Sequence, residues 1–140
     1  MIEFAFATKG VIFNENNEVL LLMKSESEDI NPNSVDIPGG RLEYKEKPEE
    51  GLVREIKEEV GINITIIAPS RIWTMVKEEK EFQLVGATFL CIAKSGQKIV
   101  LSDEHASAVW TPITDIAKKD FPEWIKAEVE SADTIRKVLT

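Results

Sequence analysis

The chain is poor in cysteine, in positive charge and in long hydrophobic runs. Cys91 is the single cysteine among 140 residues, which excludes an internal disulfide and predicts a reducing, cytoplasmic location. No apolar run approaches the ~20 residues that a membrane span needs. The N-terminal "MIEFAFATKGVIF" has an early acidic residue and no small-residue cleavage site of the signal-peptide type. We therefore expect no membrane partner.

Acidic residues outnumber basic ones. The 25 Asp and Glu residues against 17 Lys and Arg give a formal net charge of −8 at pH 7. Such a field repels a polyanion, so the charge predicts that no nucleic-acid polymer is a partner. A small ligand that carries phosphates is still compatible with this charge if a divalent cation neutralises them.

Repeats and low-complexity tracts are absent, so we expect one domain over residues 1–140. Apolar alternation and turn residues predict mostly strands, the first two joined as a hairpin through "NENN". Ser25 to Ser34 is expected to be a polar loop, and Pro69, "KEEKE" and "KSGQK" are expected to separate later strands. The predicted strands are "IEFAFATKGVIF", "EVLLLMK", "INITIIA", "SRIWTMV", "FQLVGATFLCIA" and "AVWT".

Two helices are predicted. The first runs from Pro48 to Val60, because proline suits a first helical turn and Gly61 stands where a helix C-cap would be. Its apolar side consists of Leu52, Val53, Ile56 and Val60. The second is the tail from Phe121 to Leu139. Strand–helix alternation is absent, so these elements predict an α/β fold of the α+β type, a mixed sandwich and not a doubly wound sheet.

Three glutamates crowd one side of the first helix. With about 100° per residue, Glu55, Glu58 and Glu59 share an arc of about 100°. Carboxylates ~6 Å apart repel by roughly 3 kcal/mol at an effective dielectric near 20, and anions near a helix C-terminus oppose the dipole. Either this is a solvated charged face of an ordinary α/β protein, or a hard cation such as Mg²⁺ sits there with substrate phosphates.

The residues around these glutamates favour the cation. Gly40, five residues, Glu46, seven residues and then "REIKEEVGI" resemble the signature of the Nudix hydrolases. The matching positions are Gly40, Glu46, Arg54, Glu55, Ile56, Glu58, Glu59, Gly61 and Ile62. The resemblance covers roughly Ala5 to Ile116 and implies the Nudix fold, a mixed sheet sandwiched between helices with a loop–helix–loop metal site. It also implies a small nucleotide substrate, Mg²⁺ with Mn²⁺ as a substitute, and a homodimer as one arrangement of the chain.

The resemblance implies roles for individual residues. Glu55, Glu58 and Glu59 match metal-binding positions, and the carbonyl of Gly39 resembles a further ligand. Arg54 and Glu46 look like a pair that orients the carboxylates. The general base is either Glu58 or Glu104, with Glu104 slightly favoured, and Glu104 is also a candidate metal ligand. The candidates for contact with substrate are Lys24, Gly40 and Arg41.

Aromatic residues could also contact a substrate. Five of them are candidates for stacking on a base, although residues of this kind in strands and helices are expected mostly in the core. They are Tyr44, Trp73, Phe82, Trp110 and Trp124.

The substrate prediction rests on marks that are missing. Lys77 and Glu78 stand where ADP-ribose hydrolases of the family often have a proline, and Glu79 and Lys80 where diadenosine polyphosphate hydrolases often have a tyrosine. The default is therefore a pyrophosphohydrolase of MutT-like type that converts a nucleoside triphosphate to the monophosphate and pyrophosphate. The alternatives are an ADP-ribose or nucleotide-sugar pyrophosphatase and a non-catalytic nucleotide-binding module of the same fold.

Overall fold

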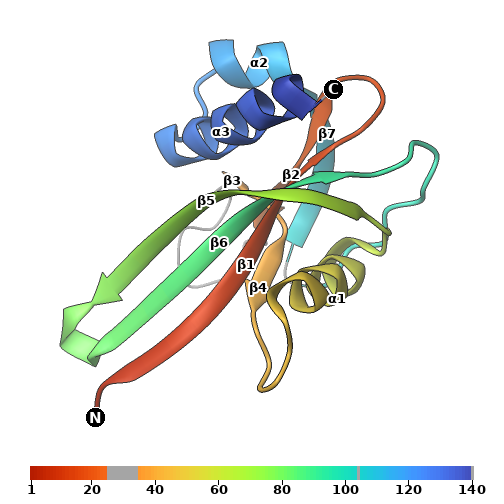
Figure 1. Ribbon diagram of the computed structural model, residues 1–140. Coiled ribbons are helices and arrows are strands. Elements are labelled where there is room, and N and C mark those ends of the chain that lie inside the picture. The colour runs from red at the N-terminus through yellow and green to blue at the C-terminus, as the bar shows by residue number, and fades with distance from the viewer. Residues whose placement is uncertain (25–34, 104, 140) are drawn as a thin grey trace.

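The computed structural model describes residues 1–24, 35–103 and 105–139. In this part of the chain, seven strands form one sheet with helices on both sides (Figure 1). The strands are β1 (Glu3–Phe13), β2 (Glu18–Lys24), β3 (Val35–Asp36), β4 (Gly39–Arg41), β5 (Thr65–Lys77), β6 (Phe82–Ile92) and β7 (His105–Pro112). The helices are α1 (Pro48–Val60), the short 3₁₀ helix η1 (Glu78–Lys80), α2 (Ile113–Lys118) and α3 (Glu123–Leu139).

Strand β1 is the centre of the sheet. One of its edges pairs in parallel with β6 along its whole length, and β6 pairs with β5 in the antiparallel sense. The antiparallel partners on its other edge are β2, through Phe13 opposite Val19, and β4, through Ala7 to Lys9 opposite Arg41 to Gly39. The hairpin expected between β1 and β2 is thus confirmed, but these strands diverge soon after the turn.

The segment from β3 to β4 occupies the space between the diverging strands. β7 pairs with one edge of β2 along that strand's length, so β1 and β3 share the other edge. β3 therefore faces β1, and β4 in turn pairs with the edge of β1 that faces β2. The sheet consequently opens around residues 36–41, which include the glycines just before α1.

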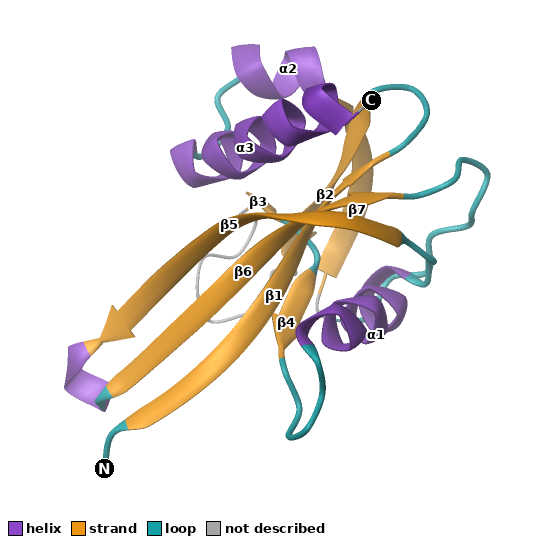
Figure 2. Ribbon diagram, viewed as in Figure 1, coloured by secondary structure: helices purple, strands orange, loops and turns teal. Residues whose placement is uncertain are grey.

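The helices cover opposite faces of the sheet (Figure 2). Ile12 of β1 belongs to the apolar cluster that contains Leu52, Ile56 and Val60 of α1. The residues on either side of it, Val11 and Phe13, belong to a second cluster with α2 and α3. Since neighbouring residues of a strand point to opposite faces, α1 lies on one face and α2 with α3 on the other. The predicted fold class is confirmed.

Several predicted boundaries are correct and others are wrong. Helix α1 runs from Pro48 to Val60 as predicted, and Gly61 adopts the left-handed conformation of a C-cap. Pro69 does not separate two strands, because β5 is continuous with register irregularities on both sides of the proline. An edge strand tolerates proline there because its outer N–H groups need no partner in the sheet. The segments β3, β4 and α2 were not predicted, and α3 begins two residues after Phe121.

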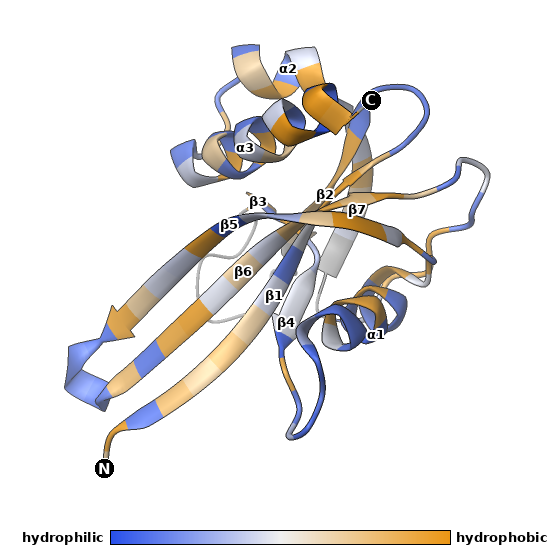
Figure 3. Ribbon diagram, viewed as in Figure 1, coloured by the Kyte–Doolittle hydropathy of each residue, from blue (hydrophilic) through white to orange (hydrophobic). Residues whose placement is uncertain are grey.

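The apolar side of α1 is narrower than predicted. Val53 is 42% exposed and lies outside both core clusters, whereas its neighbour Leu52 is fully buried. Figure 3 shows hydrophilic residues on much of α1 and on the loop that precedes it. The predicted loop from Ser25 to Ser34 lies outside the described residues. Among the described helices, none is long and apolar enough to cross a membrane.

Candidate active site

Helix α1 carries the predicted carboxylates, and its start is held by its own side chains. Pro48 stands in the first turn, and the Glu50 carboxylate accepts a hydrogen bond of 3.0 Å from the Lys47 N–H. This contact satisfies a donor that the helix itself leaves without a partner. With Ile56 buried against β1, Glu55 and Glu59 are directed toward β4, where they meet Gly40 and Gly39.

Glu59 is buried beside the glycine segment. The residue is only 8% exposed, and Oε1 accepts a hydrogen bond of 2.7 Å from the Gly39 N–H. Burial raises the pKa of the Glu59 carboxyl to about 7, opposed by the Gly39 hydrogen bond and the charge of Lys9, while Glu55 and Asp36 raise it further. Near neutral pH a small change in its surroundings therefore decides whether Glu59 is charged.

The two glycines before the loop allow a close approach of three segments. Gly39 has φ of 145°, and a Cβ there would lie 2.0 Å from the Thr8 carbonyl oxygen. At Gly40 a Cβ would lie 2.6 Å from the carboxyl carbon of Glu55. Gly40 is therefore required by the carboxylate that packs on it. Gly40 was predicted only as a contact for substrate, and the structure places it against Glu55.

Arg54 gathers four carboxylates. It binds Glu46 through two hydrogen bonds, Nε to Oε2 at 2.6 Å and Nη2 to Oε1 at 2.9 Å. Its Nη1 lies 3.2 Å from oxygens of both Glu55 and Glu58, and 3.7 Å from Glu43. The hydrogen bonds to Arg54 lower the pKa of Glu46 to about 2, and Glu46 raises the pKa of the Arg54 guanidinium. The predicted pairing of Arg54 with Glu46 is present.

The donor set suits a hard divalent cation, although its side chains do not converge. In the part of the chain that is described, no three acidic, histidine or cysteine side chains surround a common point. Glu58 is 59% exposed on its side chain and turns toward Arg54, as does Glu55. Two observations still favour a cation: all donors are oxygens, the type that Mg²⁺ prefers, and Glu55 lies in the space that a Cβ of Gly40 would fill.

A buried hydroxyl lies next to this space. Thr8 of β1 is opposite Gly40 in the sheet and is fully buried. Within the described residues its Oγ1 has no hydrogen-bond partner. Buried polar groups are usually bonded to protein, water or an ion. An oxygen donor beside the Gly40 and Glu55 contact is therefore a further feature that fits a hydrated cation.

Three other predicted residues have different outcomes. Glu104 lies outside the described residues, as does the side chain of Lys24, whose backbone ends β2. The guanidinium of Arg41 lies 4.7 Å from the centre of the Phe82 ring, and its carbonyl accepts a hydrogen bond of 3.3 Å from Arg54 Nη2. The Arg41 side chain is thus directed to Phe82, and its backbone contacts the arginine that binds the carboxylates. Phe82 is itself buried, as expected for an aromatic residue of a strand.

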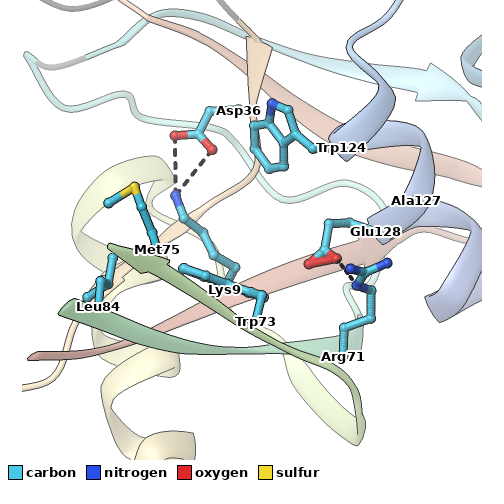
Figure 4. A pocket seen from close by; sticks show the side chains of 9 residues that line it. All are labelled: Lys9, Asp36, Arg71, Trp73, Met75, Leu84, Trp124, Ala127 and Glu128. Atoms are coloured by element: carbon cyan, nitrogen blue, oxygen red, sulfur yellow. Dashed lines mark hydrogen bonds and ion pairs between the residues drawn. The ribbon is translucent and has the colours of Figure 1, made fainter. Parts of the chain in front are cut away.

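A pocket of about 470 Å³ lies on the other side of the sheet, under α3 (Figure 4). At one side Lys9 Nζ lies 3.2 Å from both oxygens of Asp36 and 3.1 Å from the Ile37 carbonyl oxygen. Arg71 and Glu128 form a second ion pair at 2.7 Å. The remaining walls are apolar or aromatic and consist of Trp73, Met75, Leu84, Trp124 and Ala127.

A row of paired residues in the sheet connects the wall of the pocket with the glycine segment before α1. Thr88 of β6 is opposite Arg71 on one side and opposite Lys9 on the other, and Lys9 is opposite Gly39. Residues opposite each other in a sheet share a face, so one row of side chains leads from the pocket to the glycine that binds Glu59. The sequence did not lead us to predict that Lys9 and Asp36 pair with each other and line a pocket. A lysine inside an apolar strand and an aspartate before "IPGG" were the only signals.

Comparisons with known proteins give a family and several relatives. Residues 4–131 match the family model described as NUDIX domain. The 8-oxo-dGTP diphosphatase of Escherichia coli (strain K12) is 43% identical over 53 residues, covering 38% of this chain and 40% of that protein. The RNA pyrophosphohydrolase of Marinomonas sp. (strain MWYL1) is 30% identical over 95 residues, covering 66% and 56%. The chain therefore spans about half the length of these curated relatives.

The fold also matches solved structures. The crystal structure of the MutT protein from Methanosarcina mazei Go1 has a TM-score of 0.81 and 26% sequence identity, with 97% of each chain covered. This similarity extends over α2 and α3 as well as over the segment with the glutamates. The arrangement of the sheet and its helices thus belongs to a fold that is already known.

Proposed function

The chain belongs to the Nudix hydrolase family, and from this premise we propose that it hydrolyses a nucleoside triphosphate to the monophosphate and pyrophosphate with Mg²⁺. The observation that carries the proposal is the buried carboxylate of Glu59 beside Gly39, with Glu55 packed on Gly40 in the same segment. The charge of Lys9 and the Gly39 N–H lower the pKa of this carboxyl, but burial raises it more, so the charged form gains from additional positive charge nearby. A cation bound with a polyphosphate supplies such charge, and it explains why the helix keeps this cluster.

Glu55, Glu58 and Glu59 are proposed to hold the metal, with the carbonyl of Gly39. When bound, Mg²⁺ neutralises the polyphosphate and orients it for attack by water. Arg54 restrains Glu55 and Glu58 by contacts of 3.2 Å, so it would limit the positions from which these two carboxylates could hold a cation. Glu46 fixes the position of Arg54 through its two hydrogen bonds.

Either Glu104 or Glu58 is proposed to accept the proton of the attacking water. Glu58 is 59% exposed on its side chain, so solvent reaches it. The variants Glu58→Gln and Glu104→Gln separate the two, because loss of the base lowers kcat at every metal concentration, whereas loss of a ligand is partly overcome by more Mg²⁺. Arg41 and Lys24 are proposed to contact the outer phosphates.

The base of the nucleotide is proposed to bind in the pocket under α3. Its volume of about 470 Å³ and its aromatic walls are typical of sites for small ligands. Lys9 holds the Asp36 carboxylate at one side of the pocket. A carboxylate accepts hydrogen bonds, so an N–H or amino group on the edge of a heterocycle can donate to Asp36 there. Lys9, which lines this pocket, is opposite Gly39 in the sheet, and the Gly39 N–H binds Glu59, so the pocket is close to the proposed metal site.

The experiment that tests the proposal is a substrate panel with the purified protein. It includes the common nucleoside triphosphates, 8-oxo-dGTP, ADP-ribose, nucleotide sugars, dinucleoside polyphosphates and an RNA with a 5′-triphosphate. We expect Mg²⁺-dependent release of pyrophosphate from a nucleoside triphosphate, Mn²⁺ as a weaker substitute, and no activity in EDTA or in Glu59→Gln. Preference for ADP-ribose or a nucleotide sugar would favour the first alternative.

Other outcomes decide between the remaining functions. Turnover of the RNA alone would contradict the prediction, drawn from the net charge of −8, that no polymer is bound. Binding of nucleotides without any hydrolysis would identify a non-catalytic module. The homodimer and the cytoplasmic location stay predictions, and sedimentation of the purified chain at several concentrations tests the first of them.

A further inference from the structure

One wall of the pocket is an indole ring that lies flat against the sheet. Trp73 of β5 is opposite Gly86 of β6. A Cβ on Gly86 would lie 2.2 Å from Cζ2 of the indole and 2.3 Å from Cε2, so the ring occupies the place of the missing side chain. Any other residue at position 86 would lift the ring off the sheet. The indole is therefore close-packed on one face, and Trp73 lines the pocket (Figure 4).

A chain of hydrogen bonds fixes the rotation of this ring. The Trp73 Nε1–H donates to Thr88 Oγ1 at 3.0 Å, and the Thr88 hydroxyl donates in turn to the carboxylate of Glu128. The order is unambiguous because an indole N–H can only donate, an ionised carboxylate can only accept, and the hydroxyl has one hydrogen. The carboxylate thus sets the direction of the hydroxyl, and the hydroxyl sets the position of the indole.

Glu128 is anchored as well. It extends from α3, is 5% exposed, and lies 2.7 Å from the Nε of Arg71. A buried carboxylate held by an arginine and a hydroxyl is stable only while both partners remain. The contact joins residues 40 positions apart, Thr88 in the sheet and Glu128 in the helix that covers it. The same helix carries Trp124, which lines the pocket with Trp73.

We propose that Thr88 and Glu128 are positioning residues, which hold Trp73 in place as a rigid stacking surface for the base of the nucleotide. The inference rests on the proposed function, because it assigns the base to this pocket. A ring that is fixed before the ligand arrives loses little side-chain freedom on binding, so more of the stacking free energy is left for affinity. Neither residue touches the reacting phosphates, so the effect falls on binding and not on chemistry.

The test is a double-mutant cycle on Thr88 and Trp73. Thr88→Val removes the hydroxyl and keeps the shape, and we expect KM for the preferred triphosphate to rise about five- to tenfold with kcat nearly unchanged. Trp73→Phe, which removes the N–H and leaves no buried charge without a partner, should raise KM as well. In the Trp73→Phe background Thr88→Val should raise KM no further, since its effect passes through the indole.

Further variants keep the test decisive. Thr88→Ser restores the hydroxyl and should restore KM. Glu128→Met should raise KM as Thr88→Val does, and Glu130→Met is its matched control, because Glu130 is exposed on the same helix. Circular dichroism of each variant confirms that it is folded, and Trp73→Phe decides the matter if Thr88→Val does not fold. An unchanged KM in folded Thr88→Val, or a rise that persists without the indole N–H, would overturn the inference.

Binding separates this inference from the proposed function. The four ribonucleoside monophosphates are titrated without metal, with tryptophan fluorescence as the signal. If the wild-type chain binds one of them but hydrolyses no triphosphate, the proposed function fails. The double-mutant cycle on Thr88 and Trp73 is then measured with the Kd of that monophosphate in place of KM. If hydrolysis is normal and the cycle is additive, only the role of Thr88 and Glu128 fails. Absence of both hydrolysis and binding would overturn the two proposals together.

Discussion

Replacing Glu59 by glutamine is expected to stabilise the metal-free protein at pH 8 and to have little effect at pH 4. Burial raises the pKa of this carboxyl from 4.5 to about 7. Below about pH 4.5 the group is protonated in the folded and the unfolded chain, so its ionisation contributes nothing. Between pH 4.5 and 7 only the unfolded chain loses the proton, and folding becomes less favourable as the pH rises. Above pH 7 the loss is complete.

The size of the effect follows from the same two values. The difference between 4.5 and about 7, at about 1.4 kcal/mol for each pH unit, corresponds to about 3 kcal/mol at pH 8. Glutamine has the same length and keeps an oxygen that can accept from the Gly39 N–H. Glu59→Gln should therefore raise the free energy of unfolding by about 1–3 kcal/mol at pH 8, since surrounding groups relax in part.

The assay is urea unfolding in EDTA at pH 4 and pH 8, with the difference between variant and wild type taken at each pH. Taking differences removes the contribution of all other titrating groups. Glu58→Gln is the matched control: it lies on the same turn, is 59% exposed on its side chain, and should change stability by less than about 1 kcal/mol at either pH. Added Mg²⁺ should then stabilise the wild type and not Glu59→Gln.

The reasoning fails if Glu59→Gln is no more stable than the wild type at pH 8 in EDTA. That result would mean that Lys9 and the Gly39 N–H already compensate the charge, so no cation is needed at this position. Equal stabilisation at pH 4 and pH 8 would also contradict it, because a gain from better packing does not depend on pH.

Three further predictions concern the neighbouring groups. Gly40→Ala should reduce Mg²⁺-dependent turnover at least about tenfold with an unchanged circular dichroism spectrum, because the new Cβ would lie 2.6 Å from the carboxyl carbon of Glu55. Glu46→Gln should destabilise the protein at pH 6 and less at pH 3, because the hydrogen bond to Arg54 lowers the pKa of Glu46 from 4.5 to about 2 and that stabilisation fades as the pH falls. Trp124→Ala should raise KM about fivefold by removing a stacking wall while the kcat changes little; an unchanged KM would place the base elsewhere.

Local sequence determined helix α1 and most of the strands. Pro48, Gly61 and the spacing of Leu52, Ile56 and Val60 are signals within one segment, and the structure has the helix between the predicted bounds. The break that was wrongly predicted at Pro69 depends instead on tertiary structure. Proline interrupts a central strand, but β5 is an edge strand, and its place in the sheet is not encoded near the proline.

The glutamates and the arginine that contacts them could be predicted because the signature lies within one segment, residues 40–62. The pairing of Arg54 with Glu46 spans eight residues, so it could be predicted from the order of residues. The burial of Glu59 could not, since it depends on Gly39 of another segment. Whether Glu58 or Glu104 is the base was left open by the sequence, and the structure does not describe Glu104.

The sequence by itself determined where the charge lies on α1, because side chains three and four residues apart meet on any helix, and from this charge it predicted a hard cation. Only the tertiary structure decided which residues form the pocket under α3. Lys9 meets Asp36 across 27 residues and Thr88 meets Glu128 across 40. Such contacts depend on how the sheet opens and on which helix covers it, and no local pattern of residues specifies either.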